Sequence, residues 1–383
     1  MSISPTSIAP AYPTGRRAAV AAWMLEFAAL ARASFARHRW FAAIIGVYFI
    51  GAAAFEWRFT GSVGASFRLY TMTCIGMMAV MLVAILMIHA VYVMVAIRPV
   101  RLFHELGRQY RSSLFRADRI ANALPVLVLL PVFFNSFTVL KTSVPRIAPF
   151  AWDAAFESAD RWLHGGAAPW KLLQPWFANH LAAPHYLNLA YVLWFFMLWL
   201  VVVWQTFRLD APALRAQFLG TLVLCWILLG TFGSFLFSSA GPCYFGRVTG
   251  LADPYDPLMA YLREANRIAE VWSLQTQDML WSYYTGREIG FGGGISAMPS
   301  MHVAMASLLM LMASRLHWGL GLGAFLYYLI IQIGSVQLGW HYAIDGYGST
   351  IATAILWWAV GRALDRHGAP RPAPGSATPP SAR

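Results

Sequence analysis

Eight long apolar runs constrain the fold of this chain more than any other feature of its sequence. A helix that crosses the ~30 Å hydrocarbon core of a bilayer needs ~20 predominantly apolar residues. Inside lipid the backbone polar groups must be satisfied within the segment, so such runs are helices. They predict an all-α polytopic membrane protein with about eight transmembrane helices, near residues 40–56, 72–97, 123–140, 186–207, 217–239, 297–314, 318–339 and 342–361.

The composition supports the same class. Hydrophobic residues make up 59% of the 383 residues and charged residues only 11%, whereas soluble domains carry roughly a quarter charged residues. This balance excludes a soluble globular enzyme and a disordered chain. The net charge of +12 does not indicate a nucleic-acid partner, because in a membrane protein the distribution of basic residues matters more than their total. Only Lys141 and Lys171 are lysines, and this bias towards arginine indicates a GC-rich genome and hence a bacterium.

The basic residues also orient the chain. Six arginines lie in the short segment 98–119, and cytoplasmic loops carry an excess of Lys and Arg. We therefore expect a multi-pass protein of the bacterial inner membrane with both termini in the cytoplasm. The two long connections, 141–185 and 240–296, then face the periplasm. Both exceed the ~12–15 residues usual for structureless loops, so we expect them to be structured or functional.

Ionisable residues are rare within the predicted spans, where they are costly and often functional. His89 lies alone on an apolar span and is expected to be a hydrogen-bonded packing residue. Ion-coupled transporters and proton pumps usually need charged groups near the midplane of the membrane. The sequence therefore disfavours that class.

Polar residues gather where the sixth span begins. The glycines 292–294 lead through Ser296, Pro299 and Ser300 to His302. Pro299 suits the first turn of a helix, where its missing N–H has no cost. The exposed amides of that turn, with Ser296 or Ser300, form a natural anion site.

A second histidine begins the last span. On a helix, residues i and i+4 share a face, so the carboxylate of Asp345 can bond the imidazole of His341 and fix its tautomer. His302 and His341 are 39 residues apart, or about 58 Å of helix at ~1.5 Å per residue. That length is close to one passage across the ~30 Å core and one passage back. Both histidines are therefore expected at the same outer face.

Two imidazoles and a carboxylate beside a helix N-terminus suit phosphoryl transfer. One histidine attacks phosphorus, the carboxylate holds that histidine, and the other histidine protonates the leaving oxygen. A zinc site normally needs three or four protein ligands, and no third ligand with suitable spacing occurs here. We expect neither a metal nor another cofactor.

The motifs around these histidines resemble those of a known family. Ala-Met-Pro-Ser-Met-His at 297–302 and His341-x-x-x-Asp345 look like the second and third signature motifs of the type 2 phosphatidic acid phosphatase superfamily. The third motif of the family begins with Ser-Arg, whereas this chain has Gly334-Ser335, so a phosphate-binding arginine is missing. The first motif, Lys-x6-Arg-Pro, is approximated only by Lys141 followed by Pro145-Arg146.

Further segments resemble the inositol phosphorylceramide synthase-like (inositolphosphotransferase) branch of that superfamily, and eight spans also match this branch. These segments are Lys141…Pro145, Pro149-Phe150, Trp152-Asp153, Asp160, His164-Gly165, Pro169-Trp170 and the run Ser239 to Phe245. The resemblance covers roughly residues 123–360. It implies a six-helix phosphatase-type catalytic membrane domain over 123–363, preceded by two N-terminal transmembrane helices and a basic loop over 40–122. A cytoplasmic N-terminal segment, 1–39, and a disordered cytoplasmic tail, 364–383, complete the predicted organisation.

The resemblance implies metal-independent cleavage of a lipid phosphoester through a phosphohistidine intermediate. His341 would be the nucleophile, Asp345 its orienting partner and His302 the acid for the leaving alcohol. Because the arginine of the superfamily is absent, we expect Lys141, Arg146 or Arg247, together with Ser300, to bind the phosphate.

Two alternatives to such a phosphotransferase stay open. One is a lipid phosphate or polyprenyl pyrophosphate phosphatase, in which water is the acceptor. The other is a non-enzymatic lipid transporter that binds an anionic headgroup. The expected partners are a membrane phospholipid or lipid phosphate as substrate and, for a transferase, a lipid alcohol such as ceramide as acceptor.

Overall fold

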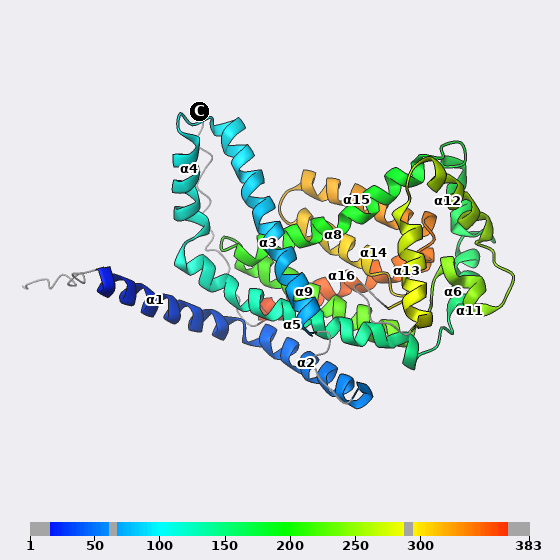
Figure 1. Cartoon of the computed structure of the whole chain (residues 1–383), viewed down its shortest axis with the longest axis horizontal. Helices are drawn as coiled ribbons and strands as arrows, with labels where there is room; N and C mark the ends of the chain where they lie inside the picture. Colours follow the sequence, from blue (N-terminus) through cyan, green and yellow to red (C-terminus); the bar gives the residue numbers. More distant parts are fainter. Residues whose placement is uncertain (1–15, 61–66, 287–293, 367–383) are drawn as a thin grey trace, which may run out of the picture.

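The structure, a computed structural model, describes residues 16–60, 67–286 and 294–366. Within these ranges all regular secondary structure is helical, as the apolar runs predict. Figure 1 shows a bundle of long helices, with short helices at one end and a helical hairpin at the other. The chain is thus an all-α, multi-pass membrane protein.

Each of the eight predicted spans corresponds to helical structure. The long helices are α2 (Arg39–Thr60), α3 (Phe67–Tyr92), α5 (Ala117–Ile147), α8 (Ala183–Phe207), α9 (Pro212–Ile227), α14 (Met301–Ser314), α15 (Trp318–Gln337) and α16 (Ala343–Arg366). Two of them continue as π-helical or short helical turns: η1 (Val93–Ile97) follows α3, and η4 (Leu228–Gly233) with α10 (Ser234–Leu236) follows α9.

Six helical segments in the described part of the chain are long and apolar enough to cross a membrane. The two others, α14 and α16, fall outside this set: α14 has 14 residues and α16 begins with a polar turn containing Asp345. These two helices carry His302 and Asp345. The two long helices outside this set are therefore ones that carry residues expected to do chemistry.

The two long connections are structured, as predicted. The first contains α6 (Asp153–Leu163), α7 (Pro169–Leu173) and η3 (Gln174–Trp176), and the second contains η5 (Pro242–Tyr244), α11 (Phe245–Thr249), α12 (Asp256–Ile268) and α13 (Trp272–Gly286). Figure 1 shows α6, α11, α12 and α13 together at one end of the bundle. They cover the ends of the helices at which both histidines lie.

The basic segment lies at the opposite end of the bundle. Between α3 and α5 it forms α4 (Leu102–Gln109), which continues directly into η2 (Tyr110–Leu114), and this helical stretch folds back on α3 as a hairpin.

The C-terminal tail differs in part from expectation, and the N-terminal segment contains a helix. The helix α1 (Arg16–Arg37) occupies much of the predicted N-terminal segment. The helix α16 extends through Arg366, so residues 364–366 are helical and not part of a disordered tail. The rest of these two predicted segments, 1–15 and 367–383, lies outside the described residues.

The helix α14 lies at the centre of the bundle. It packs against α15, α16, α9 and α8, and it buries Val303, Ala304, Met305 and Leu308 completely.

The first turn of α14 does not begin where the sequence predicts. Ser300 is the N-cap, so Pro299 precedes the helix, in a cis peptide with Met298. A Cβ on Gly233 would lie only 2.8 Å from the ring of Pro299, so that glycine leaves room for the proline to pack against η4.

Candidate active site

The two histidines meet at one end of the bundle. His302 lies in the first turn of α14, and His341 lies in the turn between α15 and α16. Their ring centroids are 5.8 Å apart and the planes are inclined by 62°. The expectation that 39 residues return the chain to the same face of the bundle is confirmed.

Asp345 lies behind His341. Its Oδ2 is 3.4 Å from His341 Nδ1, and the carboxylate is fully buried. The same oxygen accepts the backbone N–H of Tyr342 at 3.0 Å. The pair does not share one helical face as predicted, because α16 starts at Ala343 and His341 precedes it. The two side chains still meet because a turn forms at the start of the helix, where the N–H of Asp345 donates to the Tyr342 carbonyl at 3.2 Å.

The contact between Asp345 and His341 is longer than an ordinary hydrogen bond. Neither His341 Nδ1 nor Asp345 Oδ1 has a hydrogen-bond partner among the described residues. Buried polar atoms in native proteins are nearly always bonded, and an exception calls for an explanation such as a catalytic role. Catalytic hydrogen bonds are often long in unliganded proteins and tighten when substrate binds.

Aromatic side chains of α8 hold His302. Its ring stacks on Tyr191 with a centroid separation of 4.6 Å and an angle of 24°. Trp194 meets the same ring edge-on at 4.6 Å. Such contacts restrict the imidazole to one orientation, facing His341. Sequence reasoning missed both aromatics, although their spacing of three residues on one helix was a usable signal.

The helix α6 contributes two buried carboxylates that tie the site together, and Asp153 is the first. Its oxygens accept the N–H groups of Ala240, at 2.9 and 3.1 Å, and of Gly241, at 2.8 Å. The hydroxyl of Tyr342, the neighbour of His341, donates to it at 2.9 Å. Burial raises the pKa of Asp153 above its ordinary value, while these donors oppose the shift.

Asp160, two turns further along α6, caps the helix that carries Asp345. It accepts the N–H of Ala343 at 2.7 Å and that of Ile344 at 2.9 Å. A carboxylate at a helix N-terminus satisfies free amides and interacts favourably with the helix dipole. Burial nevertheless raises the pKa of Asp160 to about 6. Sequence reasoning noted Asp153 and Asp160 only through a resemblance and gave them no role.

The loop after α10 joins the two histidine segments. Ser239 accepts the N–H of Ala297 at its carbonyl (2.9 Å) and that of Met298 at its hydroxyl (3.2 Å). Gly241 has φ of +99°, and a Cβ there would lie 2.6 Å from the carbonyl oxygen of Trp340. The loop therefore touches both the segment before His302 and the residue before His341. Only glycine fits that approach.

The predicted phosphate-binding residues differ in their placement. Lys141, on α5, lies beside the segment that precedes His302: a Cβ on Gly294 would be 2.7 Å from the Lys141 carbonyl oxygen. Ser300 uses its buried hydroxyl to accept the N–H of Val303 at 3.4 Å, so it serves as a helix cap.

Two parts of the predicted anion site fall where the structure gives no description. The side chain of Arg146 is one of them, and the glycines 292 and 293 are the other.

Arg247 is not part of the histidine cluster. It is exposed on α11, and its guanidinium lies over the ring of Trp281, 5.1 Å from the centroid. In the described part of the chain no contact joins it to either histidine. Likewise, no group of three or more His, Cys, Asp or Glu among the described residues could hold a metal ion.

Comparison with known proteins identifies a family. The family model of the PAP2 superfamily matches residues 154–359, which is more than half of the chain. The matched region contains His302, His341 and Asp345, together with Asp160. No curated protein and no solved structure matches the chain.

Proposed function

Because the chain belongs to the PAP2 superfamily, whose members are generally phosphatases, we propose that it is a membrane enzyme that cleaves or transfers a lipid phosphoester through a phosphohistidine on His341. One observation carries the proposal. Two imidazoles lie 5.8 Å apart, and a fully buried carboxylate stands behind one of them. A phosphoryl group between the two rings would have a nucleophile on one side and a proton donor on the other.

The proposed first step forms one bond and breaks one. Asp345 accepts the Nδ1–H of His341, which leaves the lone pair on Nε2 free to attack phosphorus. The bond from phosphorus to the lipid oxygen breaks, and protonated His302 donates its proton to that oxygen. The products are an N-phosphorylated His341, a neutral His302 and a free alcohol.

The second step reverses these roles. Neutral His302 takes a proton from the acceptor hydroxyl, whose oxygen attacks the phosphohistidine and releases His341. With water as the acceptor the enzyme is a phosphatase. With a lipid alcohol as the acceptor it is a phosphotransferase.

The negative charge of the phosphoryl group needs cations and backbone donors. Lys141 is the best supported of the proposed ligands because it adjoins the segment before His302. The amides at the N-terminus of α14, which Ser300 caps, add the positive end of a helix dipole. Arg146 stays as a further candidate for the same role.

Within the superfamily we propose the inositolphosphotransferase-like branch, with a phosphatidylinositol-type donor and a ceramide or diacylglycerol acceptor. Its support is the first long connection, in which Asp153 and Asp160 anchor the segment with His341 and the start of α16. These carboxylates lie in the part of the chain that resembles this branch. We also propose that the site faces the periplasm, since the basic hairpin lies at the opposite end of the bundle (Figure 1).

The test uses purified protein in vesicles of defined lipids. One assay supplies phosphatidic acid or a polyprenyl pyrophosphate and measures free phosphate. A second supplies phosphatidylinositol with ceramide or with isotopically labelled diacylglycerol and measures the headgroup on the acceptor. We expect transfer to dominate, and we expect His341→Ala and His302→Ala to abolish it. His180→Ala is the matched control, because His180 is exposed and lies in the connection between η3 and α8.

Each outcome has a clear meaning. Free phosphate without a transfer product would replace the branch proposal by a lipid phosphatase. Lipid movement across the vesicle bilayer without any phosphoester cleavage would favour the transporter. Near wild-type activity of His341→Ala on every substrate that the native enzyme cleaves would overturn the catalytic assignment.

A further inference from the structure

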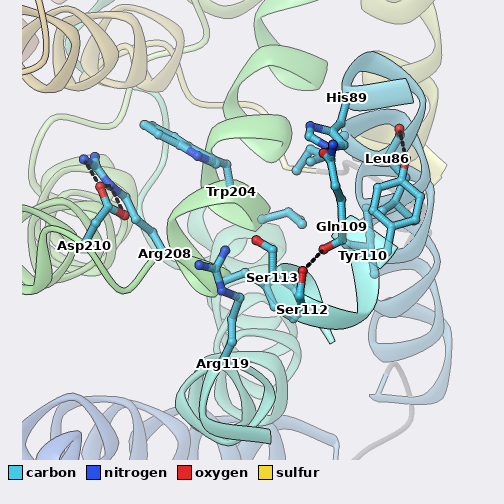
Figure 2. Close-up of a pocket in the computed structure, with 14 residues that line it drawn as sticks. Leu86, His89, Gln109, Tyr110, Ser112, Ser113, Arg119, Trp204, Arg208 and Asp210 are labelled. Carbon is cyan, nitrogen blue, oxygen red and sulfur yellow. Dashed lines mark hydrogen bonds and ion pairs between the residues drawn. The ribbon is translucent and has the colours of Figure 1, made fainter. Parts of the chain in front are cut away.

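A pocket of about 290 Å³ lies at the other end of the bundle, away from the histidines. It is formed by the second half of α3, the end of α8, the stretch of α4 and η2, and the start of α5 (Figure 2). Tyr191 of α8 touches His302, whereas Phe207 of the same helix lines this pocket. Sixteen residues of helix separate them, or ~24 Å. The pocket is therefore distinct from the histidine site and lies near the opposite face of the membrane.

Arg119 is the central feature of this pocket. Figure 2 shows its side chain reaching up from α5 to lie beside Ser113. Its Nε is buried without a hydrogen-bond partner, and among the described residues its guanidinium makes no hydrogen bond or ion pair. A buried donor without a partner is costly. Such an atom indicates a site completed by something that the chain itself does not supply.

Arg208 is a second arginine whose guanidinium has a donor without a partner. Its Nε and Nη2 donate to Asp210 at 2.9 to 3.2 Å, and it packs over the ring of Trp204. Its Nη1 is buried and has no partner in the described part of the chain. The positive charge of Arg119 also acts on Asp210 at longer range. The pocket thus contains two guanidinium groups and one carboxylate, and its net charge is positive.

The neighbouring charges do not cancel that excess. On the hairpin Glu105 pairs with Arg108. At the start of α5, Asp118 pairs with Arg116.

The other polar groups that line the pocket include two that are already occupied. His89 Nε2 donates to Gln109 at 2.9 Å, and the Tyr110 hydroxyl donates to the Leu86 carbonyl at 2.7 Å. His89 is thus the hydrogen-bonded residue that the sequence predicts. Arg119 and Arg208 are the charged groups of the lining that have a buried donor without a partner in the described part of the chain.

The remaining wall of the pocket is apolar. Leu82 and Ile85 of α3 face it from one side, and Val203 and Phe207 of α8 from the other. A free inorganic anion would gain nothing from that wall. An amphiphile would place its charged group at Arg119 and its hydrocarbon along α3 and α8.

We propose that this pocket binds the phosphate of an anionic membrane lipid, with Arg119 as its main ligand and the Nη1 of Arg208 as a second donor. The lipid comes from the leaflet opposite the histidines, and its acyl chain lies between α3 and α8. Basic pockets between membrane helices suit anionic lipid headgroups. The site is separate from catalysis, so this proposal does not depend on the proposed function.

The experiment uses the full-length protein in nanodiscs of phosphatidylcholine that contain phosphatidylglycerol with a photoreactive acyl chain. After irradiation, labelled peptides are identified by mass spectrometry. We expect labelling within α3 and at the end of α8. In Arg119→Gln we expect the labelling of these peptides to fall at least fivefold. Arg111→Gln is the matched control, because Arg111 is exposed on η2 and does not line the pocket. Arg119→Lys, which keeps the charge, should retain most of the labelling.

Further arms of the experiment separate the sources of phosphate. A photoreactive phosphatidylcholine should label these peptides weakly, and millimolar inorganic phosphate should not displace the anionic probe. Displacement by inorganic phosphate would assign the pocket to a free anion and overturn the lipid proposal. Equal labelling of Arg119→Gln and Arg111→Gln would overturn it as well, provided that thermal unfolding curves show both variants to be folded.

Discussion

The carboxylate of Asp160 on α6 accepts the N–H of Ala343, the first residue of α16, at 2.7 Å. This single bond joins the first long connection to the helix that carries Asp345. His341 lies two residues before Ala343, so the bond also fixes where the turn with His341 ends. The geometry of the histidine site therefore depends on a direct contact between two elements that are far apart in the sequence.

Loss of this cap should weaken the site. Asp160→Ala leaves the amides of Ala343 and Ile344 without their acceptor, and removal of an N-cap costs about 1–2 kcal/mol. We expect a lower thermal midpoint and a fall of about tenfold or more in kcat, measured on the same purified protein, with Asp160→Asn less affected because it keeps one acceptor oxygen. Asp256→Ala is the control, since Asp256 is exposed at the same end of the molecule. Equal effects of the two alanine variants would contradict the role of Asp160.

The same carboxyl predicts a pH dependence of stability. Burial raises the pKa of Asp160 from 3.8 to about 6, so the folded protein holds this proton more tightly than the unfolded chain. Protonation of Asp160 therefore contributes fully to the free energy of unfolding below pH 3.8, and this contribution is lost as the pH rises through 6. Between pH 7.5 and pH 5 the gain should be roughly 1 kcal/mol. Thermal midpoints at both pH values check this: Asp160→Asn should show a smaller change than the native protein, and an identical change would refute the assignment.

The proposed acid role of His302 predicts a dependence on the leaving group. His302→Ala should lower kcat/KM for a lipid phosphoester by about 10²–10⁴. The kcat/KM of the same variant for an aryl phosphate such as p-nitrophenyl phosphate should fall much less, because that leaving group needs no proton. His341→Ala should abolish both reactions. Parallel steady-state measurements check the pattern, and an equal loss on both substrates in His302→Ala would exclude a proton-donor role.

The close approach at Gly241 predicts a steric effect on the site. In Gly241→Ala the new Cβ would lie 2.6 Å from the Trp340 carbonyl oxygen, so the turn that carries His341 has to shift. We expect a loss of about 2 kcal/mol in stability and at least a tenfold fall in kcat. Gly250→Ala is the matched control: Gly250 also has a positive φ, +65°, but its Cβ would meet no atom within 4 Å. Similar kinetic losses in both variants would point to backbone strain in place of the clash.

Much of the fold and part of the site could be predicted from the sequence. The helical class and the meeting of His302 with His341 follow from apolar run lengths and from the 39-residue spacing. The start of α14 could not be predicted in this way. Pro299 suits a first helical turn, but its packing against Gly233 and the cap by Ser300 place it before the helix.

The sequence by itself determined the membrane class and the pairing of the two histidines, because bilayer thickness and helical rise convert residue counts directly into distances. Only the tertiary structure decided which groups hold these histidines. Tyr191 stacks on His302, and Asp160 caps α16, across separations of more than a hundred residues. It also placed Arg119 beside the end of α8 to form the second pocket. Local spacing carries no information about such contacts, since they depend on how whole helices pack.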